Sequence, residues 1–224
     1  MLQAQKFAFI GSGAMGEAMI KGLITQANLP PQQITASDTR PERGVELEQK
    51  YGVRHTTDNL TAVDGATIVV LSVKPQVLHD VLKQLAGHIA PEALVLSIVA
   101  GARTEVITNL LQHKAVARSM PNTPAQIGLG MTVWTCPESM SQLHRDQAKA
   151  VFSSIGEEVY VTDERYLDMA TALSGTGPAY VFLFMEAMVD AGVHMGFSRN
   201  IAEQLVFQTV RGSGLRKITR RARS

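Results

Sequence analysis

The 224-residue chain has little of several features that mark specialised protein classes. Its one cysteine, Cys136, can form no internal disulfide and no cysteine-rich metal site, which favours a reducing compartment. No stretch approaches the ~18–20 unbroken apolar residues of a membrane span, and the early apolar run Phe7–Ile10 is too short for a signal peptide. A net charge of only +1 argues against a dedicated nucleic-acid binder. We therefore expect a cytoplasmic protein that binds neither nucleic acid nor membrane.

The small net charge is distributed unevenly along the chain. The last 14 residues hold six of the 21 Lys and Arg residues and no acidic residue, which leaves 15 basic against 20 acidic side chains in residues 1–210. The acidic body strengthens the argument against nucleic-acid binding. Residues 211–224 lack helical apolar periodicity, so we expect a disordered basic tail there. Such a tail can also bind nucleic acid or an anionic membrane, and this alternative stays open.

What the sequence does contain is a repeated alternation of strand and helix patterns. The apolar run Phe7–Ile10 precedes an amphipathic helix from Ala14 to about Thr25. In Thr67–Ser72 the four central residues are apolar at consecutive positions, as in a strand covered on both faces. The repetition predicts an α/β fold with a Rossmann-type, doubly wound parallel sheet. After Glu164 every pattern is helical. We therefore predict three parts: a dinucleotide-binding domain (1–164), a helical dimerisation and substrate segment (165–210), and the tail (211–224).

A glycine-rich loop follows the first predicted strand. It reads Gly11-Ser12-Gly13-Ala14-Met15-Gly16, the G-x-G-x-x-G pattern of dinucleotide-binding proteins. Gly11 allows the tight turn, Gly13 lets the backbone approach a pyrophosphate, and Gly16 lets helix and strand pack closely. Free N–H groups at the start of the following helix favour the phosphates. Because the loop lies between a strand and a helix, we predict a site for NADPH or NADH.

The end of the second predicted strand gives conflicting signals about which dinucleotide is bound. Asp38 is suited to accept hydrogen bonds from the adenosine ribose and to repel a 2′-phosphate, which favours NADH. Arg40, with Ser37 and Thr39, is suited to bind that phosphate through charge-assisted hydrogen bonds, which favours NADPH. The sequence does not choose between them.

Further ligand contacts are expected where later strands end, since ligands of doubly wound sheets gather at the carboxyl ends of the strands. Small residues at two such ends leave room for the nicotinamide ribose, and Lys74 is a candidate donor to the ribose or the substrate. These predicted turns are Ser72-Val73-Lys74-Pro75 and Ala100-Gly101. The six histidines show no metal-ligand spacing, and we expect no metal site.

Five motifs, in this order and spacing, resemble the pyrroline-5-carboxylate reductase family over residues from about 6 to 210. They are the glycine loop, Ser-Val-Lys-Pro75, Ala-Gly101, Arg-Ser-Met-Pro-Asn-Thr-Pro-Ala125 and Ala-Leu-Ser-Gly-Thr-Gly-Pro-Ala-Tyr180. The resemblance implies an oxidoreductase that reduces the imine 1-pyrroline-5-carboxylate to L-proline with NAD(P)H, the last step of proline biosynthesis. It also implies a Rossmann domain and a helical domain through which subunits form a homodimer or a larger homo-oligomer.

The same resemblance assigns residues by position. It implies that the dinucleotide is held by the glycine loop and by two further groups of residues. These are Ser37, Asp38, Arg40 and Asn59 on the adenosine side, and Ser72–Pro75 with Val99, Ala100 and Gly101 on the nicotinamide side. It implies that the imine lies near Met120, Pro121, Asn122, Thr123, Ser174 and Gly175.

The sequence departs from the family pattern toward its C-terminal end. The family carries a Ser-Pro-Gly-Gly-Thr-Thr turn that holds the substrate carboxylate, and residues 1–224 contain no such turn, so the catalytic residue is unassigned. We expect residues 211–224 to be a truncated or frameshifted end. The hypothesis is that this chain binds dinucleotide but reduces the imine poorly. A non-catalytic dinucleotide-binding remnant and a β-hydroxyacid dehydrogenase on the same fold are the alternatives.

Overall fold

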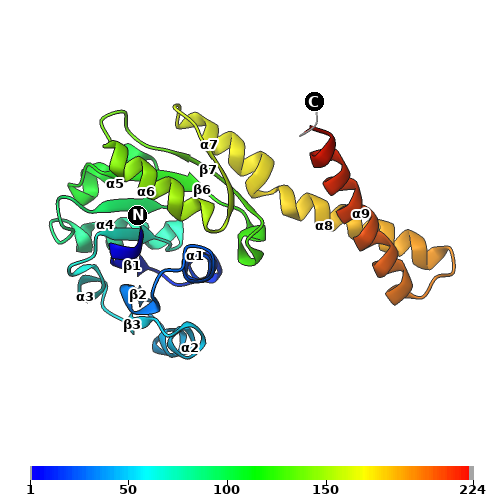
Figure 1. The fold of residues 1–224 in the computed structure, drawn as a ribbon, viewed down its shortest axis with the longest axis horizontal. Helices are drawn as coiled ribbons and strands as arrows, with labels where there is room; N and C mark the ends of the chain where they lie inside the picture. The colour runs from blue at the N-terminus through cyan, green and yellow to red at the C-terminus, as the bar shows by residue number, and fades with distance from the viewer. Residues whose placement is uncertain (1, 222–224) are drawn as a thin grey trace. The chain divides into compact units, whose positions relative to one another are not determined.

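The computed structural model describes residues 2–221, with the backbone alone for residues 216–221. The chain divides into two compact units, Met1–Gly175 and Thr176–Ser224. We call the first the sheet unit and the second the helical unit, and describe each by itself (Figure 1).

The sheet unit is built on one eight-stranded sheet in the order β3-β2-β1-β4-β5-β6-β7-β8. All neighbouring strands are parallel except β6 and β7, which are antiparallel. The expected Rossmann-type sheet is thereby confirmed, with its change of strand order between β1 and β4. The strands are β1 Phe7–Ile10, β2 Ile34–Ser37, β3 Arg54–Thr56, β4 Ile68–Leu71, β5 Leu94–Ser97, β6 Val116–Met120, β7 Gly130–Thr135 and β8 Gly156–Tyr160.

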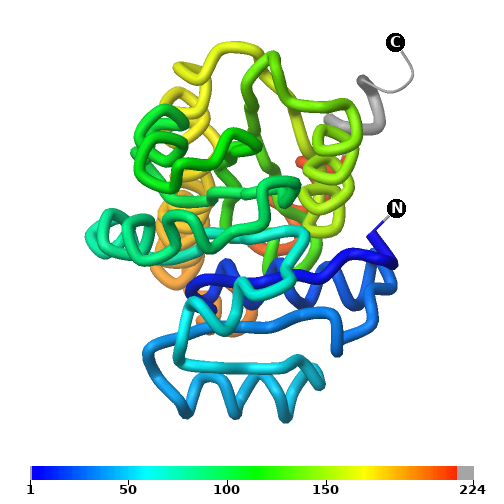
Figure 2. Tube along the Cα trace, turned by 90° about the vertical axis from the view of Figure 1, so that its left-hand side faces the viewer, coloured from blue at the N-terminus to red at the C-terminus, as the bar shows by residue number. Residues whose placement is uncertain are grey.

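Helices cover both faces of this sheet. They are α1 Ala14–Thr25, α2 Pro41–Tyr51, α3 Asn59–Val63, α4 Pro75–Leu85, α5 Thr104–Leu111, α6 Gln142–Ser153 and α7 Arg165–Ala170. Alternate residues of β1 serve the two faces, since side chains of a strand point alternately to opposite sides. Phe7 and Phe9 join the core under α1, α2 and α6, whereas Ala8 and Ile10 join the core under α3, α4 and α5. The tube in Figure 2 follows the same chain from a second direction.

The sheet unit extends past the boundary expected after residue 164. It includes α7 and a π-helical turn, Thr171–Gly175. Two polar contacts tie this segment to the sheet: Nη2 of the buried Arg118 in β6 lies 3.5 Å from Asp168 Oδ1 of α7, and Asn122 Nδ2 donates to Ser174 O at 3.0 Å. The strand patterns in the sequence end before residue 165, and the end of a strand pattern carries no information about such contacts.

The helical unit consists of α8, Gly177–His194, and α9, Arg199–Arg221. The two helices pack closely at Gly192, where an added Cβ would lie only 3.0 Å from Ala202 Cβ. The helix continues to Arg221, so the disorder expected from residue 211 is not seen through that residue, and residues 222–224 lie outside the described part. Arg, Lys and Leu are strong helix formers, and the α9 backbone stays helical through Gly212 and Gly214.

One stretch, Arg165–His194, is long and apolar enough to cross a membrane by length and composition alone, and only 6% of its most apolar window is buried. The sequence contains no unbroken apolar run of that length, because Glu186 and Asp190 interrupt the stretch.

Candidate cofactor and substrate site

The glycine loop connects the end of β1 to α1, and its three glycines have different surroundings. Gly11 has a φ of +87°, and a Cβ there would lie 2.8 Å from Ser72 O. A Cβ on Gly16 would lie 3.0 Å from Gly11 O, whereas one on Gly13 would meet nothing within 4 Å. The first and third glycines therefore admit the close approach of α1 to the sheet. The second leaves the outer side of the loop open.

The start of α1 offers a place for a negatively charged group. Gly13 is its N-cap and supplies no side chain to satisfy the first N–H groups. Those N–H groups and the positive end of the helix dipole favour phosphate. An open loop face above an uncapped helix start fits the pyrophosphate of a dinucleotide.

Ser12, the residue between the first two glycines, is fully buried and anchored through all of its polar groups. Its N and Oγ donate to Asp38 Oδ2 at 3.2 and 3.1 Å, and its carbonyl oxygen accepts from Arg43 Nε at 2.8 Å. Arg43 also forms ion pairs with Glu17 and Glu46. The segment after β2 thus fixes the glycine loop from the side. Arg43 is not among the residues predicted from the sequence, although its place in the first turn of the helix after β2 is a usable signal.

The other predicted adenosine-side residues bond mainly to the protein itself. Ser37 Oγ donates to Asn59 Oδ1 at 2.8 Å, and Asn59 Nδ2 donates to Gln84 Oε1 at 2.9 Å. Burial opposes ionisation of Asp38, but hydrogen bonds from Arg40 and Ser12 outweigh it and lower the pKa of the carboxyl below its ordinary value. Asp38 is therefore charged at neutral pH. Arg40 is the most exposed member of the Asp38–Arg40 ion pair, with 58% of its side chain accessible.

The predicted nicotinamide-side residues lie at the ends of β4 and β5. Ser72 joins β4 to β1, because its Oγ donates to Gly11 O at 2.6 Å and its N to Ile10 O at 2.9 Å. Lys74 is exposed and is the N-cap of α4. Val99 is buried, whereas Ala100 and Gly101 are exposed. The Ser72 contacts set the spacing of the two strand ends across which a dinucleotide of this fold lies.

A half-open hollow of about 500 Å³ lies between α4 and α5. Three predicted residues line it, together with apolar side chains of both helices: Pro75, Ala100 and Gly101, then Leu78, Leu82, Val106 and Leu110. Its volume is within the range of small-molecule sites. The structure thus brings these turn residues together around one apolar depression.

The residues predicted near the imine form one junction in the sheet unit. Asn122 donates through Nδ2 to Ser174 O and accepts through Oδ1 from Met131 N at 2.8 Å. A Cβ on Gly175 would lie 3.0 Å from Met120 Cε, so the π-helical turn packs directly on the end of β6. Pro121 is buried and Thr123 is exposed. Two segments that lie about fifty residues apart in the sequence thus share one position at the end of β6.

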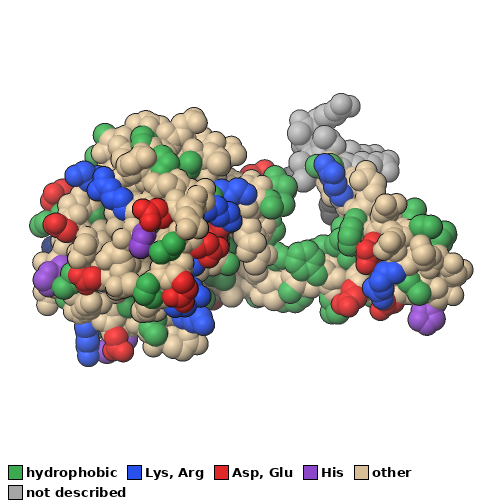
Figure 3. Space-filling model, turned by 90° about the horizontal axis from the view of Figure 1, so that it is seen from below, with side chains coloured by type: hydrophobic (Ala, Val, Ile, Leu, Met, Phe, Trp, Pro, Cys, Tyr) green, Lys and Arg blue, Asp and Glu red, His purple; other side chains and the backbone are tan. Residues whose placement is uncertain are grey.

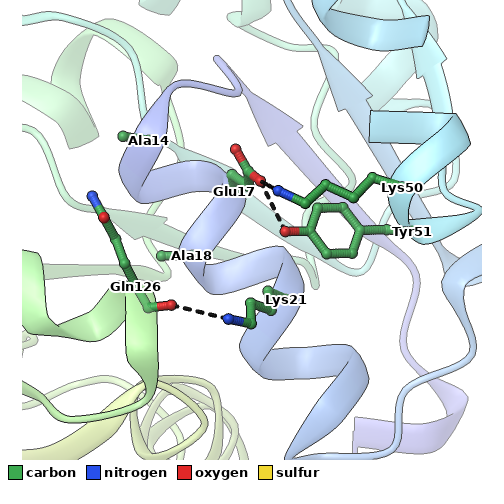
Figure 4. Close-up of a pocket in the computed structure, with 7 residues that line it drawn as sticks. All are labelled: Ala14, Glu17, Ala18, Lys21, Lys50, Tyr51 and Gln126. Atoms are coloured by element: carbon green, nitrogen blue, oxygen red, sulfur yellow. Dashed lines mark hydrogen bonds and ion pairs between the residues drawn. The ribbon is translucent and has the colours of Figure 1, made fainter. Parts of the chain in front are cut away.

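A smaller hollow lies on the outer side of α1 and is not suited to a dinucleotide. Its volume is about 220 Å³, below the usual range for ligand sites. Glu17 Oε1 accepts there from Lys50 Nζ at 2.7 Å and from Tyr51 OH at 2.8 Å (Figure 4). Burial opposes ionisation of Glu17, but hydrogen bonds from Arg43, Lys50 and Tyr51 outweigh it and lower its pKa from 4.5 to about 2. This cluster joins α1 to α2 beside the glycine loop.

Comparison with known proteins gives matches to both units. Residues 6–101 match the family model described as NADP oxidoreductase coenzyme F420-dependent, and residues 164–220 match the model described as pyrroline-5-carboxylate reductase dimerisation. A pyrroline-5-carboxylate reductase of Synechocystis sp. is 40% identical over 93% of this chain and 77% of its own length. One from Pseudomonas aeruginosa is 38% identical over 95% of this chain and 78% of its own length.

Solved structures agree with these matches. A pyrroline-5-carboxylate reductase from Coxiella burnetii has a TM-score of 0.89 at 32% identity, over 96% of this chain and 80% of the other. One from Plasmodium falciparum with NADP bound has a TM-score of 0.84 at 27% identity, over 94% of this chain and 78% of the other. A prephenate dehydrogenase from Aquifex aeolicus, with a TM-score of 0.64 at 14% identity, shares the fold alone.

Proposed function

Because the chain belongs to the pyrroline-5-carboxylate reductase family, we propose that it reduces 1-pyrroline-5-carboxylate to L-proline with NADPH or NADH, in the cytoplasm. The observation that carries this proposal is the 40% identity to a reductase of this family over 93% of the chain. The geometry supports it, because an open glycine loop and a polar junction both lie at the carboxyl ends of the strands. Residues 1–224 correspond to about three quarters of the relatives' length.

Three elements of the chain are assigned to cofactor binding. The loop Gly11–Gly16 and the start of α1 hold the pyrophosphate, the segment after β2 holds the adenosine end, and the turns after β4 and β5 hold the nicotinamide end. When bound, the dinucleotide supplies the hydride that reduces the C=N carbon of the imine. The protein contributes chiefly by placing the two reactants, since close and oriented contact accounts for much of the rate of such a reaction.

The junction of Met120–Thr123 with Ser174–Gly175 is assigned to the substrate. Asn122 holds its two backbone partners through both ends of its carboxamide, which fixes the shape of the turn. The side chain of Asn122 is therefore a positioning group. The exposed Thr123 hydroxyl and nearby backbone groups are the ones available for the substrate.

The helical unit is assigned to self-association as a homodimer or larger homo-oligomer. Large apolar side chains of α8 are exposed, among them Phe182 at 63% and Phe184 at 60%. Exposed apolar patches of this kind mark interaction surfaces. The match of residues 164–220 to the dimerisation model supports this assignment.

A steady-state assay tests the proposed reaction. The full chain is mixed with racemic pyrroline-5-carboxylate and NADPH, and both the loss of NADPH absorbance and the appearance of proline are measured. We expect equal amounts of NADPH consumed and proline formed. Binding of NADPH without proline formation would contradict the proposal and favour a non-catalytic dinucleotide-binding protein.

Substitution at Gly13 tests the position of the pyrophosphate. Gly13→Ala adds a methyl group that meets no protein atom, at a backbone φ of −65° that alanine adopts freely. We expect an unchanged unfolding temperature and dinucleotide binding weakened by about tenfold or more, because the methyl group occupies the approach of the phosphates. Gly212→Ala, whose added methyl also meets nothing, serves as control and should bind normally. Normal binding by Gly13→Ala would place the dinucleotide elsewhere.

A further inference from the structure

The carboxylate of Asp38 has no acceptor position left for a ribose hydroxyl. A carboxylate accepts about four hydrogen bonds, two at each oxygen. Oδ2 accepts from Ser12 N at 3.2 Å and from Ser12 Oγ at 3.1 Å, and Oδ1 accepts from Arg40 N and Nε, each at 3.1 Å. A hydroxyl of the adenosine ribose could reach Asp38 only by displacing one of these partners.

Arg40 is in the opposite situation. Its Nε is held by Asp38, while its two terminal amino groups have no hydrogen-bond partner in the part of the chain that the structure describes. The side chain is 58% accessible, and Asp38 fixes its position at the end of β2. A planar guanidinium with two unused amino groups matches the geometry of a phosphate. The neighbouring Ser37 hydroxyl donates to Asn59, and Arg43 is paired with Glu17 and Glu46. Arg40 therefore has the unused cationic donors in the described segment after β2.

We propose, on the premise of the function above, that Arg40 selects NADPH by binding its 2′-phosphate, and that Asp38 is a positioning residue that holds Arg40 and the glycine loop. This resolves the conflict between the two side chains. An acidic residue at this position favours NADH when it faces a ribose, but Asp38 accepts its hydrogen bonds from donors of the protein. Its negative charge is compensated by Arg40 on one side and by the Ser12 N–H and hydroxyl on the other.

The opposite assignment makes different predictions. If Asp38 bound the ribose, its replacement would weaken NADH binding selectively and would strengthen NADPH binding by removing a repelling charge. If Asp38 positions the loop, its replacement weakens both dinucleotides, and NADH loses no more affinity than NADPH.

Equilibrium titration of the full chain with NADPH and with NADH separates these cases. We expect the unaltered protein to bind NADPH about tenfold or more tightly than NADH. Arg40→Ala should weaken NADPH binding by about 10- to 100-fold, the value of charge-assisted hydrogen bonds, and leave NADH binding within about twofold of its starting value. Arg40→Lys keeps the positive charge but loses the planar guanidinium with its two amino groups. Its affinity for NADPH should lie between those of the unaltered protein and Arg40→Ala.

The control is Arg165→Ala. Arg165 N and Nε both donate to Asp163 Oδ1, two residues before it, as Arg40 N and Nε donate to Asp38 Oδ1, and Arg165 also donates to Asp163 Oδ2. It follows β8 and is distant in sequence from the glycine loop, so its replacement should change neither affinity. This control separates the loss of any Asp-x-Arg pair from the loss of this one.

Two substitutions test the positioning role. Asp38→Asn should weaken both dinucleotides, and Ser12→Ala, which removes only one bond to Asp38, should do so to a smaller extent. If Asp38→Asn does not fold in a thermal unfolding scan, Ser12→Ala decides this part. Selective loss of NADH binding in either variant, or stronger NADPH binding in Asp38→Asn, would overturn the positioning role.

Failure of this inference is distinguishable from failure of the proposed function. If the unaltered protein forms proline but binds both dinucleotides equally, or if Arg40→Ala weakens both equally, the selection by Arg40 is wrong and the function stands. If the unaltered protein binds neither dinucleotide, the proposed function itself is contradicted.

Discussion

The two units of the chain treat their apolar side chains in different ways. The sheet unit encloses two continuous cores, one on each face of the sheet, whose members are nearly all inaccessible to solvent. In the described part of the helical unit the buried core consists of Val189, Ala202 and Val206. Many other apolar side chains of α8 and α9 are exposed, and apolar groups are visible over this unit in Figure 3. The sheet unit completes its own core, whereas the helical unit presents a surface that another chain can cover.

The difference has a simple geometric origin. A sheet covered on both faces buries every residue of its central strands, as the burial of all four residues of β1 and β4 shows. Two packed helices bury only one stripe each. The helix α8 is apolar around most of its circumference, and helices of that kind are buried in larger assemblies.

Truncation of a phenylalanine should lower stability strongly in the sheet unit and only slightly in the helical unit. Phe9 is inaccessible and Phe184 is 60% exposed. Phe9→Ala should lower the free energy of unfolding by about 3–5 kcal/mol, because it opens a cavity in a closed core. Phe184→Ala, which removes a side chain outside that core, should change the free energy of unfolding of the sheet unit by less than about 1 kcal/mol. Urea denaturation measures both, and equal losses would contradict the contrast between the units.

A charge on α8 should break self-association. Phe184→Asp places a carboxylate on the exposed apolar face, and we expect the dissociation constant of the oligomer to rise by roughly 30-fold or more, which corresponds to about 2 kcal/mol for an anchor residue. Sedimentation equilibrium measures it. Val45→Asp adds the same charge at a partly exposed position of α2. An unchanged mass for Phe184→Asp, or an equal effect of Val45→Asp, would place the interface outside α8.

The sheet unit should also carry an acid-sensitive contribution near the glycine loop. The folded pKa of Glu17, about 2, lies below its ordinary value of 4.5, so the ionised form stabilises the fold above pH 4.5 and this stability is lost as the pH falls toward 2. With its side chain 19% exposed, we expect a loss of about 1–3 kcal/mol.

Glu17→Gln should remove that part of the pH dependence, measured as the free energy of unfolding between pH 6 and pH 3. Glu46→Gln, which alters the other, more exposed carboxylate beside Arg43, is the control and should keep most of it. An unchanged slope in Glu17→Gln would assign the acid sensitivity to other carboxylates.

Much of the sheet unit could be predicted from the sequence because its signals are local. The run Phe7–Ile10, the glycine loop and the helix from Ala14 to Thr25 each depend on neighbouring residues, and each agrees with the structure. The extent of the sheet unit could not be predicted, because it depends on the contacts of Arg118 with Asp168 and of Asn122 with Ser174, which join residues about fifty positions apart. The anchoring of Ser12 by Arg43 was missed for the same reason, since it joins residues 31 positions apart.

The helical C-terminal part shows a different limit. Residues 211–221 carry no apolar period, yet the backbone remains helical there. A lack of amphipathic pattern predicts that a segment has no buried face. It does not predict that the segment leaves the helix, which is governed by backbone propensity.

The anchored Ser12 has a consequence for the energetics of ligand binding. Its N–H, hydroxyl and carbonyl are already bonded to Asp38 and Arg43 before any ligand arrives. The loop therefore has little conformational entropy to lose on binding, and no ordering step should precede association. We expect a single-exponential approach to equilibrium whose rate rises linearly with dinucleotide concentration. The heat-capacity change should be only as large as the apolar area that the ligand covers.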